Sequence, residues 1–183
     1  MYRTLFALAF LFFFAPSGTA VAQQHEAAMN RLAAFAGTYS LDGDYHDPSG
    51  QIHRSALDGD LTVSSVLGGE FQEWDWTMDM GDEGTTHLRM IATYDPTTDG
   101  YSIWRFDTRD LETGRQLGAR GDLRFEGDAL VMVWRMANPD DPTEWGAFRN
   151  VIKRTASGLH VDTSVVPDGQ ARMAVATTRA SRG

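Results

Sequence analysis

The feature that most constrains this chain is the stretch FQEWDWTMDM at 71–80, in which apolar and polar side chains alternate without a break. Successive side chains of a β-strand point to opposite faces, so the spacing places Trp74, Trp76 and Met78 together on one bulky apolar face. Asp75 and its alternate neighbours lie on the opposite, acidic face. A helix does not produce a period of two over ten residues, so the stretch predicts a strand with one buried side.

The following segment, HLRMIATY at 87–94, alternates with the same period and places Met90 on its apolar face. The glycine-bearing GDEG at 81–84 has the length of a hairpin connection. Antiparallel pairing across this connection would set Arg89 beside Asp75 as a cross-strand charge pair. The two segments therefore predict a central β-hairpin with an apolar face and a charged face.

Short alternating runs separated by turn residues continue to the end of the chain. The connections contain glycine or proline, as in DPTTDG at 95–100 and PDG at 167–169, because glycine adopts positive φ and proline presets φ. Ten strands in one small domain predict an all-β, antiparallel up-and-down barrel, which leaves no exposed sheet edge. A two-sheet sandwich is the alternative architecture. The expected strands are 38–44, 54–67, 71–80, 87–94, 101–108, 116–125, 129–136, 144–154, 159–165 and 172–179.

The amino-terminal residues have a different character. Residues 1–22 contain one charge, at Arg3, followed by the apolar run LFALAFLFFFA and the small residues Ala20–Ala22. This pattern is typical of a secretory signal peptide cleaved before Gln23. The apolar run is too short to span a bilayer, so no stable membrane insertion is expected. We expect one exported domain over 23–183, either periplasmic or secreted.

One short helix is expected at 25–36, where apolar residues recur at helical spacing and Gly37 follows. The composition then limits the partners. Acidic residues number 25 against 16 basic ones, for a net charge of −9, so nucleic acid is a poor partner. The chain has no cysteine, which excludes thiol nucleophiles, thiolate metal sites and disulfides.

Methionine and tryptophan gather on the apolar faces of the expected strands. Trp104 alternates with Phe106, and Trp134 alternates with Met132, so these tryptophans are expected to face the interior. Methionine is flexible and suits a surface that adapts to varied apolar shapes, so a cavity for a small apolar or amphipathic ligand is one interpretation. Ordinary core filling is the other. The residues expected to line the cavity are Trp74, Trp76, Met78, Met90, Trp104, Trp134 and Arg149.

Several short motifs carry a resemblance to a known family. They are Gly37-Thr38-Tyr39, Gly68-Gly69-Glu70-Phe71, Tyr94-Asp95-Pro96, Tyr101-Ser102-Ile103-Trp104 and Arg149-Asn150-Val151-Ile152. With these motifs most of the expected mature chain resembles the bacterial family called domain of unknown function 1579. The resemblance implies a calycin-like, lipocalin-related barrel and supplies no catalytic residues. Tyr39 departs from the family pattern, where many relatives carry Trp, and it is expected to affect packing at the closed end of the barrel.

No motif in the sequence specifies a reaction. The five histidines share no metal-ligand spacing, so no zinc site and no cofactor are expected, with haem ligation by a strand histidine as the remaining alternative. Asp-Gly-Asp occurs at 42–44 and 58–60 without the spacing of a calcium loop, and both are interpreted as turns. No G-x-S-x-G is present.

Two other classes of function stay open. A small-barrel enzyme acting on an aromatic or carboxylate-bearing substrate would use polar side chains in the cavity. Its candidates are Tyr39, Glu70, Arg105 and Arg149, of which Arg149 is expected to point inward unless it forms a salt bridge with an acid. A structural or interaction module without a ligand is the third interpretation.

Overall fold

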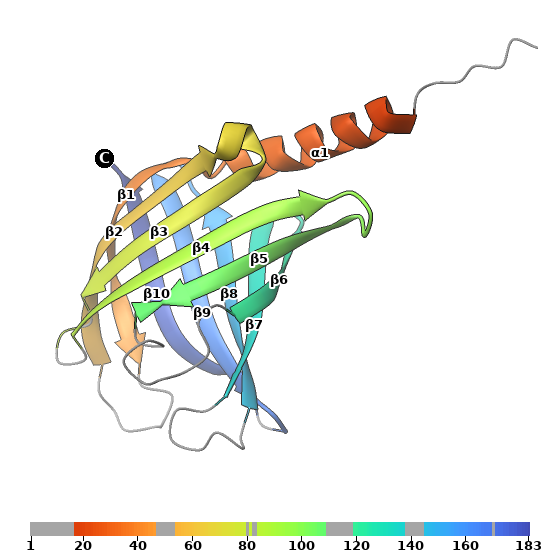
Figure 1. The fold of residues 1–183 in the computed structure, drawn as a ribbon. Coiled ribbons are helices and arrows are strands. Elements are labelled where there is room, and N and C mark those ends of the chain that lie inside the picture. The colour runs from red at the N-terminus through yellow and green to blue at the C-terminus, as the bar shows by residue number, and fades with distance from the viewer. Residues whose placement is uncertain are drawn as a thin grey trace, which may run out of the picture.

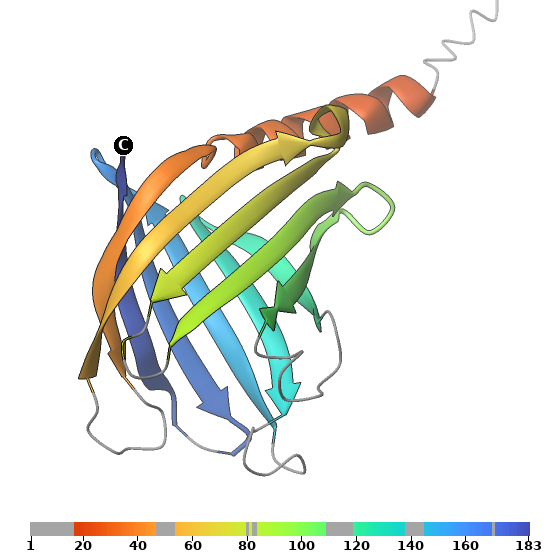
Figure 2. The same ribbon diagram turned by 60° about the vertical axis from the view of Figure 1, so that its left-hand side comes forward.

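The computed structural model describes residues 17–46, 54–79, 81, 84–108, 119–137, 145–169 and 171–183. Its strands curve around a common axis to form a barrel, and one helix lies across an end of it (Figure 1). Turning the molecule by 60° shows the same arrangement, with the amino-terminal part of the helix projecting beyond the rim (Figure 2). The all-β prediction with one amino-terminal helix is therefore confirmed.

The barrel is a closed antiparallel meander. Each strand pairs with the next along the chain, and β1 pairs with β10 to close the sheet. The order confirms the up-and-down barrel over the two-sheet alternative, and each of the ten expected strands has a counterpart. The strands are β1 Gly37–His46, β2 Arg54–Val66, β3 Phe71–Asp79, β4 Thr85–Asp95, β5 Gly100–Asp107, β6 Ala119–Glu126, β7 Ala129–Ala137, β8 Trp145–Arg154, β9 Gly158–Pro167 and β10 Met173–Arg182, with a short 3-10 helix, η1, at Leu67–Gly69 between β2 and β3.

The helix α1 spans Ser17–Ala33, so it begins and ends earlier than the predicted helix at 25–36. Its last turn tightens, because the amides of Phe35 and Ala36 donate to the carbonyls of Leu32 and Ala33 at 3.0 Å. The ring of Phe35, which follows this turn, is buried. Residues 1–16 of the expected signal peptide lie outside the described residues.

The hairpin of β3 and β4 confirms the alternation seen in the sequence. Trp74 and Trp76 are buried, and the intervening Asp75 is partly exposed. Asp75 lies directly opposite Arg89 in the register of the two strands. The Arg89 guanidinium donates to the Asp75 carboxylate at 2.8 Å, so the predicted cross-strand charge pair is confirmed.

The two Asp-Gly-Asp motifs are not turns, contrary to the sequence interpretation. They lie within β1 and β2, where Asp42 is directly opposite Asp58. Gly59 is placed where β2 approaches β3 closely: a Cβ on this residue would lie 2.0 Å from the carbonyl oxygen of Thr77. The glycine therefore permits strand pairing here rather than a reversal of the chain.

Candidate functional site

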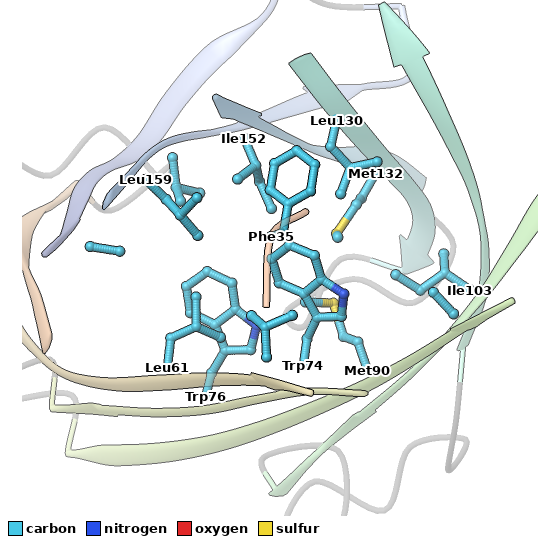
Figure 3. Packing of buried hydrophobic residues seen from close by; sticks show 14 of the residues in the cluster. Phe35, Leu61, Trp74, Trp76, Met90, Ile103, Leu130, Met132, Ile152 and Leu159 are labelled. Carbon is cyan, nitrogen blue, oxygen red and sulfur yellow. The ribbon is translucent and has the colours of Figure 1, made fainter. Parts of the chain in front are cut away.

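At the end covered by α1, buried side chains of the helix and the strands fill the interior of the barrel, beside a pocket of about 80 Å³ lined in part by Arg31, Phe35 and Phe125. Figure 3 shows Phe35 beside Trp74, and their ring centroids are 5.8 Å apart. The Trp74 indole donates from Nε1 to Oε1 of Gln72 at 2.9 Å, and Nε2 of Gln72 donates to the carbonyl of Leu32 at 2.6 Å. The buried amide of Gln72 thus joins the end of the helix to the barrel wall. We call this region the helix end.

Tyr39 belongs to the helix end as well. Its hydroxyl donates to the carbonyl of Phe35 at 2.8 Å, and the guanidinium of Arg182 approaches the same hydroxyl at 3.3 Å. The ring itself is buried. Tyr39 therefore ties the helix-to-β1 connection to the barrel.

Polar contacts also fasten α1 to the turn between β4 and β5. Gln24 donates to the hydroxyl of Tyr94 at 2.5 Å and to Asp99 at 2.9 Å, while Tyr94 donates to Asp99. The hydrogen bond to the Asp99 carboxylate raises the pKa of Tyr94 above its ordinary value. His25 lies between the carbonyl of Tyr94, at 3.1 Å, and the carboxylate of Glu70, at 3.0 Å. Glu70 is thus engaged at the rim rather than inside the barrel.

The opposite half of the interior contains a buried ion pair on β5. Arg105 is directly opposite Met90, and Asp107 is directly opposite Leu88, so both side chains share the inner face. The Arg105 guanidinium donates to the Asp107 carboxylate, and both residues are buried. Removing two charges from water is costly, and such pairs are weak evidence for stability. We call this half of the interior the far half.

Three further polar groups of the far half are buried without a hydrogen-bond partner in the described part of the chain. They are Nε1 of Trp76, Nε1 of Trp134 and Oγ1 of Thr86. The exposed fractions of these residues are 4%, 2% and 1%. Figure 3 shows the Trp76 indole directed into the barrel. Buried polar groups in native proteins are nearly always paired, so these three groups call for a partner such as a water molecule or a ligand.

The structure brings five of the seven predicted lining residues to the inner face. Met90 is fully buried, and it is directly opposite Trp74 of β3 and Arg105 of β5. Met78 is directly opposite the buried Thr86. Trp74 belongs to the packed helix end, which leaves Trp76, Met78 and Trp134 in the far half. The inner-face residues are Trp74, Trp76, Met78, Met90 and Trp134.

Trp104 faces outward, so the prediction that it lines the cavity is wrong. It is paired with Ile91 and Arg120 on the outer face, and its alternate neighbour Phe106 is 41% exposed. The adjacent Ile103 is the inward-facing apolar residue here and is fully buried. Because β5 carries apolar side chains on both faces, its periodicity did not identify the inner one, and the register with β4 decides it.

Arg149 also faces outward, which corrects the prediction of an inward side chain. Its register partner is Val133, whereas the adjacent Phe148 is opposite the buried Trp134. The guanidinium forms an ion pair with Glu126 at 2.9 Å, the acidic partner considered as the alternative. Hydrogen bonding from Arg124, with the charge of Arg149, lowers the pKa of Glu126. Arg149 and Tyr39 are therefore not brought together as an enzyme site.

Sequence reasoning missed buried polar residues of the inner face, among them Gln72, Thr86 and Asp107. Gln72 lies two residues before Trp74 in the stretch 71–80, so the period of two already predicted that it shares the inner face. Asp107 follows Arg105 by two residues and therefore shares its face. Thr86 precedes the expected start of its strand, which the structure extends to Thr85, and no pattern in the sequence indicated it.

The described residues contain no group of three or more His, Asp or Glu side chains arranged to hold a metal ion. In the same part of the chain, no helix combines the length and apolar character needed to cross a membrane. A scan against protein-family models found no matching family, and a search of curated proteins found no similar sequence.

Proposed function

We propose that this protein is exported and binds a small apolar or amphipathic molecule inside its barrel. The observation that carries the proposal is the set of unpartnered polar groups in the far half, on Trp76, Thr86 and Trp134. A buried donor or acceptor without a partner costs about 1–3 kcal/mol, so three in one half of the interior favour a partner that the described part of the chain does not supply. A bound molecule would supply the missing partners.

The lining supports the apolar part of this ligand. Met78, Met90 and Trp76 present polarisable surfaces to the interior, and methionine adapts to ligands of different shape. Sites of this kind are largely apolar with a few polar groups that set orientation. The proposal of export depends on the signal-peptide pattern of residues 1–22, and membership of the resembled family stays a prediction.

Ligand binding can be tested through the tryptophans. Addition of an apolar fluorophore or of a medium-chain lipid should change the emission of the interior indoles with saturation at micromolar concentration, and should raise the midpoint of thermal unfolding. Native mass spectrometry of the protein isolated from its own host should show a bound small molecule. If no apolar compound binds saturably, the interior is filled and the structural interpretation replaces this one.

Export is tested separately. The intact mass of protein recovered from the periplasm or medium should correspond to a chain that begins at Gln23. An exported species that retains residues 1–22 would contradict the signal-peptide prediction while leaving the binding proposal intact.

A further inference from the structure

The unpartnered groups of the far half belong to one continuous part of the inner wall. In the strand register, Trp76 is opposite Leu88, and Leu88 is opposite Asp107, so these three residues form one row across β3, β4 and β5. Thr86 is the next inward-facing residue of β4, and Arg105 is the preceding one of β5. The Trp76 indole, the Thr86 hydroxyl and the ion pair are therefore neighbours on this wall.

Trp134 reaches the same part of the wall from β7. A Cβ on Gly121 of β6 would lie 3.3 Å from Cδ1 of Trp134 and 3.2 Å from Cγ2 of Ile103. The Trp134 indole therefore covers Gly121 and extends toward Ile103 of β5. Arg105 follows Ile103 as the next inward residue of β5, so the Cδ1 edge of the indole, next to Nε1, is directed over β6 toward the strand that carries the ion pair.

The chemistry of these groups specifies the partner that is missing. An indole N–H only donates a hydrogen bond, and a threonine hydroxyl donates or accepts. Two buried donors, from Trp76 and Trp134, therefore require acceptor atoms. A ligand made only of carbon and hydrogen would cover the wall and leave both donors unpaired.

The charges on the inner wall further limit the class of ligand that can bind there. Arg105 and Asp107 are the charged residues among the buried ones that the structure describes, and their formal charges cancel. A carboxylate placed here would add a second anion beside Asp107 in a region shielded from water, where an uncompensated charge is costly. An uncharged oxygen acceptor avoids this cost and still pairs with the indole donors.

We propose, building on the binding function above, that the ligand is an uncharged molecule with an apolar body and a carbonyl group, such as a ketone, ester or amide. The carbonyl oxygen accepts from the indole N–H groups of Trp76 and Trp134. The apolar body packs against Met78, Met90 and the surrounding wall. The ion pair of Arg105 and Asp107 holds the polar side of the wall in place.

The test compares three ten-carbon probes, 2-decanone, decane and decanoate, by calorimetric titration of the mature protein at pH 7. Trp76→Phe and Trp134→Phe each remove one donor and keep an aromatic ring. Each should weaken 2-decanone binding about fivefold, the value of one hydrogen bond, and weaken decane binding less than twofold. Decanoate should bind at least about tenfold more weakly than 2-decanone.

Trp104→Phe is the matched control, because it makes the same chemical change on the outer face and should leave the affinity for each probe unchanged. If Trp76→Phe does not fold, Thr86→Val tests the same wall with a nearly isosteric change. Equal losses for decane and 2-decanone in the Phe variants, or tighter binding of decanoate than of 2-decanone, would overturn the carbonyl proposal and leave the binding function standing. Absence of binding by all three probes would overturn both.

Discussion

Trp74 and Trp76 lie two residues apart on the same face of β3, yet they belong to different kinds of interior. At the helix end, Trp74 donates to Gln72, and Gln72 donates to the chain at the end of α1. In the far half, the described part of the chain offers the Trp76 indole no hydrogen-bond partner. The comparison teaches that burial alone does not identify a binding surface, because both indoles are buried and only hydrogen-bond satisfaction separates them.

The largest expected effect is the removal of one member of the far-half ion pair. Arg105→Met leaves the charge of Asp107 buried and should lower the free energy of unfolding by about 3–5 kcal/mol. The double variant Arg105→Met/Asp107→Leu removes both charges and should return to within about 1 kcal/mol of the parent, or exceed it. Urea denaturation measures both. A double variant as unstable as the single one would show that the pair stabilises the fold.

Gln72→Leu should produce the next largest loss. The change removes the acceptor of the Trp74 indole and the donor to the Leu32 carbonyl, so two buried groups lose their partner and the free energy of unfolding should fall by about 2–4 kcal/mol. The matched variant in the far half is Thr86→Val, which removes a hydroxyl that has no hydrogen-bond partner among the residues that the structure describes. Its stability should stay the same or rise by up to about 1 kcal/mol. Similar losses in both variants would remove the distinction between the two halves.

The two tryptophans provide a direct comparison. Trp74→Phe and Trp76→Phe remove similar ring volume, but only the first also leaves the Gln72 oxygen without its donor. The first variant should therefore be less stable than the second by about 1–2 kcal/mol in chemical denaturation. A smaller loss at Trp74 than at Trp76 would mean that ring packing, rather than hydrogen bonding, separates the helix end from the far half.

Substitutions on the outer face of the barrel should change stability only slightly, whether they lie near the helix end or the far half. Asp75→Asn removes the ion pair between Asp75 and Arg89, in which the Asp75 side chain is 41% exposed and the Arg89 side chain 54% exposed. The free energy of unfolding should fall by at most about 1 kcal/mol in low salt and by less in high salt. Ligand affinity should not change, because Asp75 lies on the face directed to water. An affinity loss equal to that of Trp76→Phe would show that the ligand binds outside the barrel.

Alkaline pH should act on the helix end alone. The folded pKa of Tyr94 is raised by its hydrogen bond to Asp99, so the stabilisation is complete below the unfolded value of about 10 and is lost as pH rises through the folded value. The protection of amides near Gln24, measured as the exchange rate relative to that of the unfolded chain at the same pH, should therefore fall above about pH 10. Tyr94→Phe should reduce this fall and leave the part that is due to Tyr101, whose pKa is raised by burial. Equal acceleration in β7 and β8 over the same range would indicate global loosening instead.

Which residues share the interior was only partly predictable from the sequence. In β3 one face is apolar and the other charged, so the positions of Trp74 and Trp76 followed from the period of two. In β5 the apolar Ile103 and Trp104 are adjacent, and in β8 the apolar Phe148 and Val151 lie on opposite faces beside Arg149. Periodicity gives no preference in such strands, and the predictions for Trp104 and Arg149 were wrong for this reason.

The all-β barrel, its ten strands and the charge pair of Asp75 and Arg89 were predictable from the amino-acid sequence, because alternation, turn residues and hairpin spacing are local properties of the chain. The pairing of buried polar groups was not. The partner of a buried polar atom depends on contacts between distant segments, such as Gln72 with Leu32 or Trp134 with Gly121. Register and closure of the sheet set these contacts, and they separate the satisfied indole of Trp74 from the unsatisfied one of Trp76.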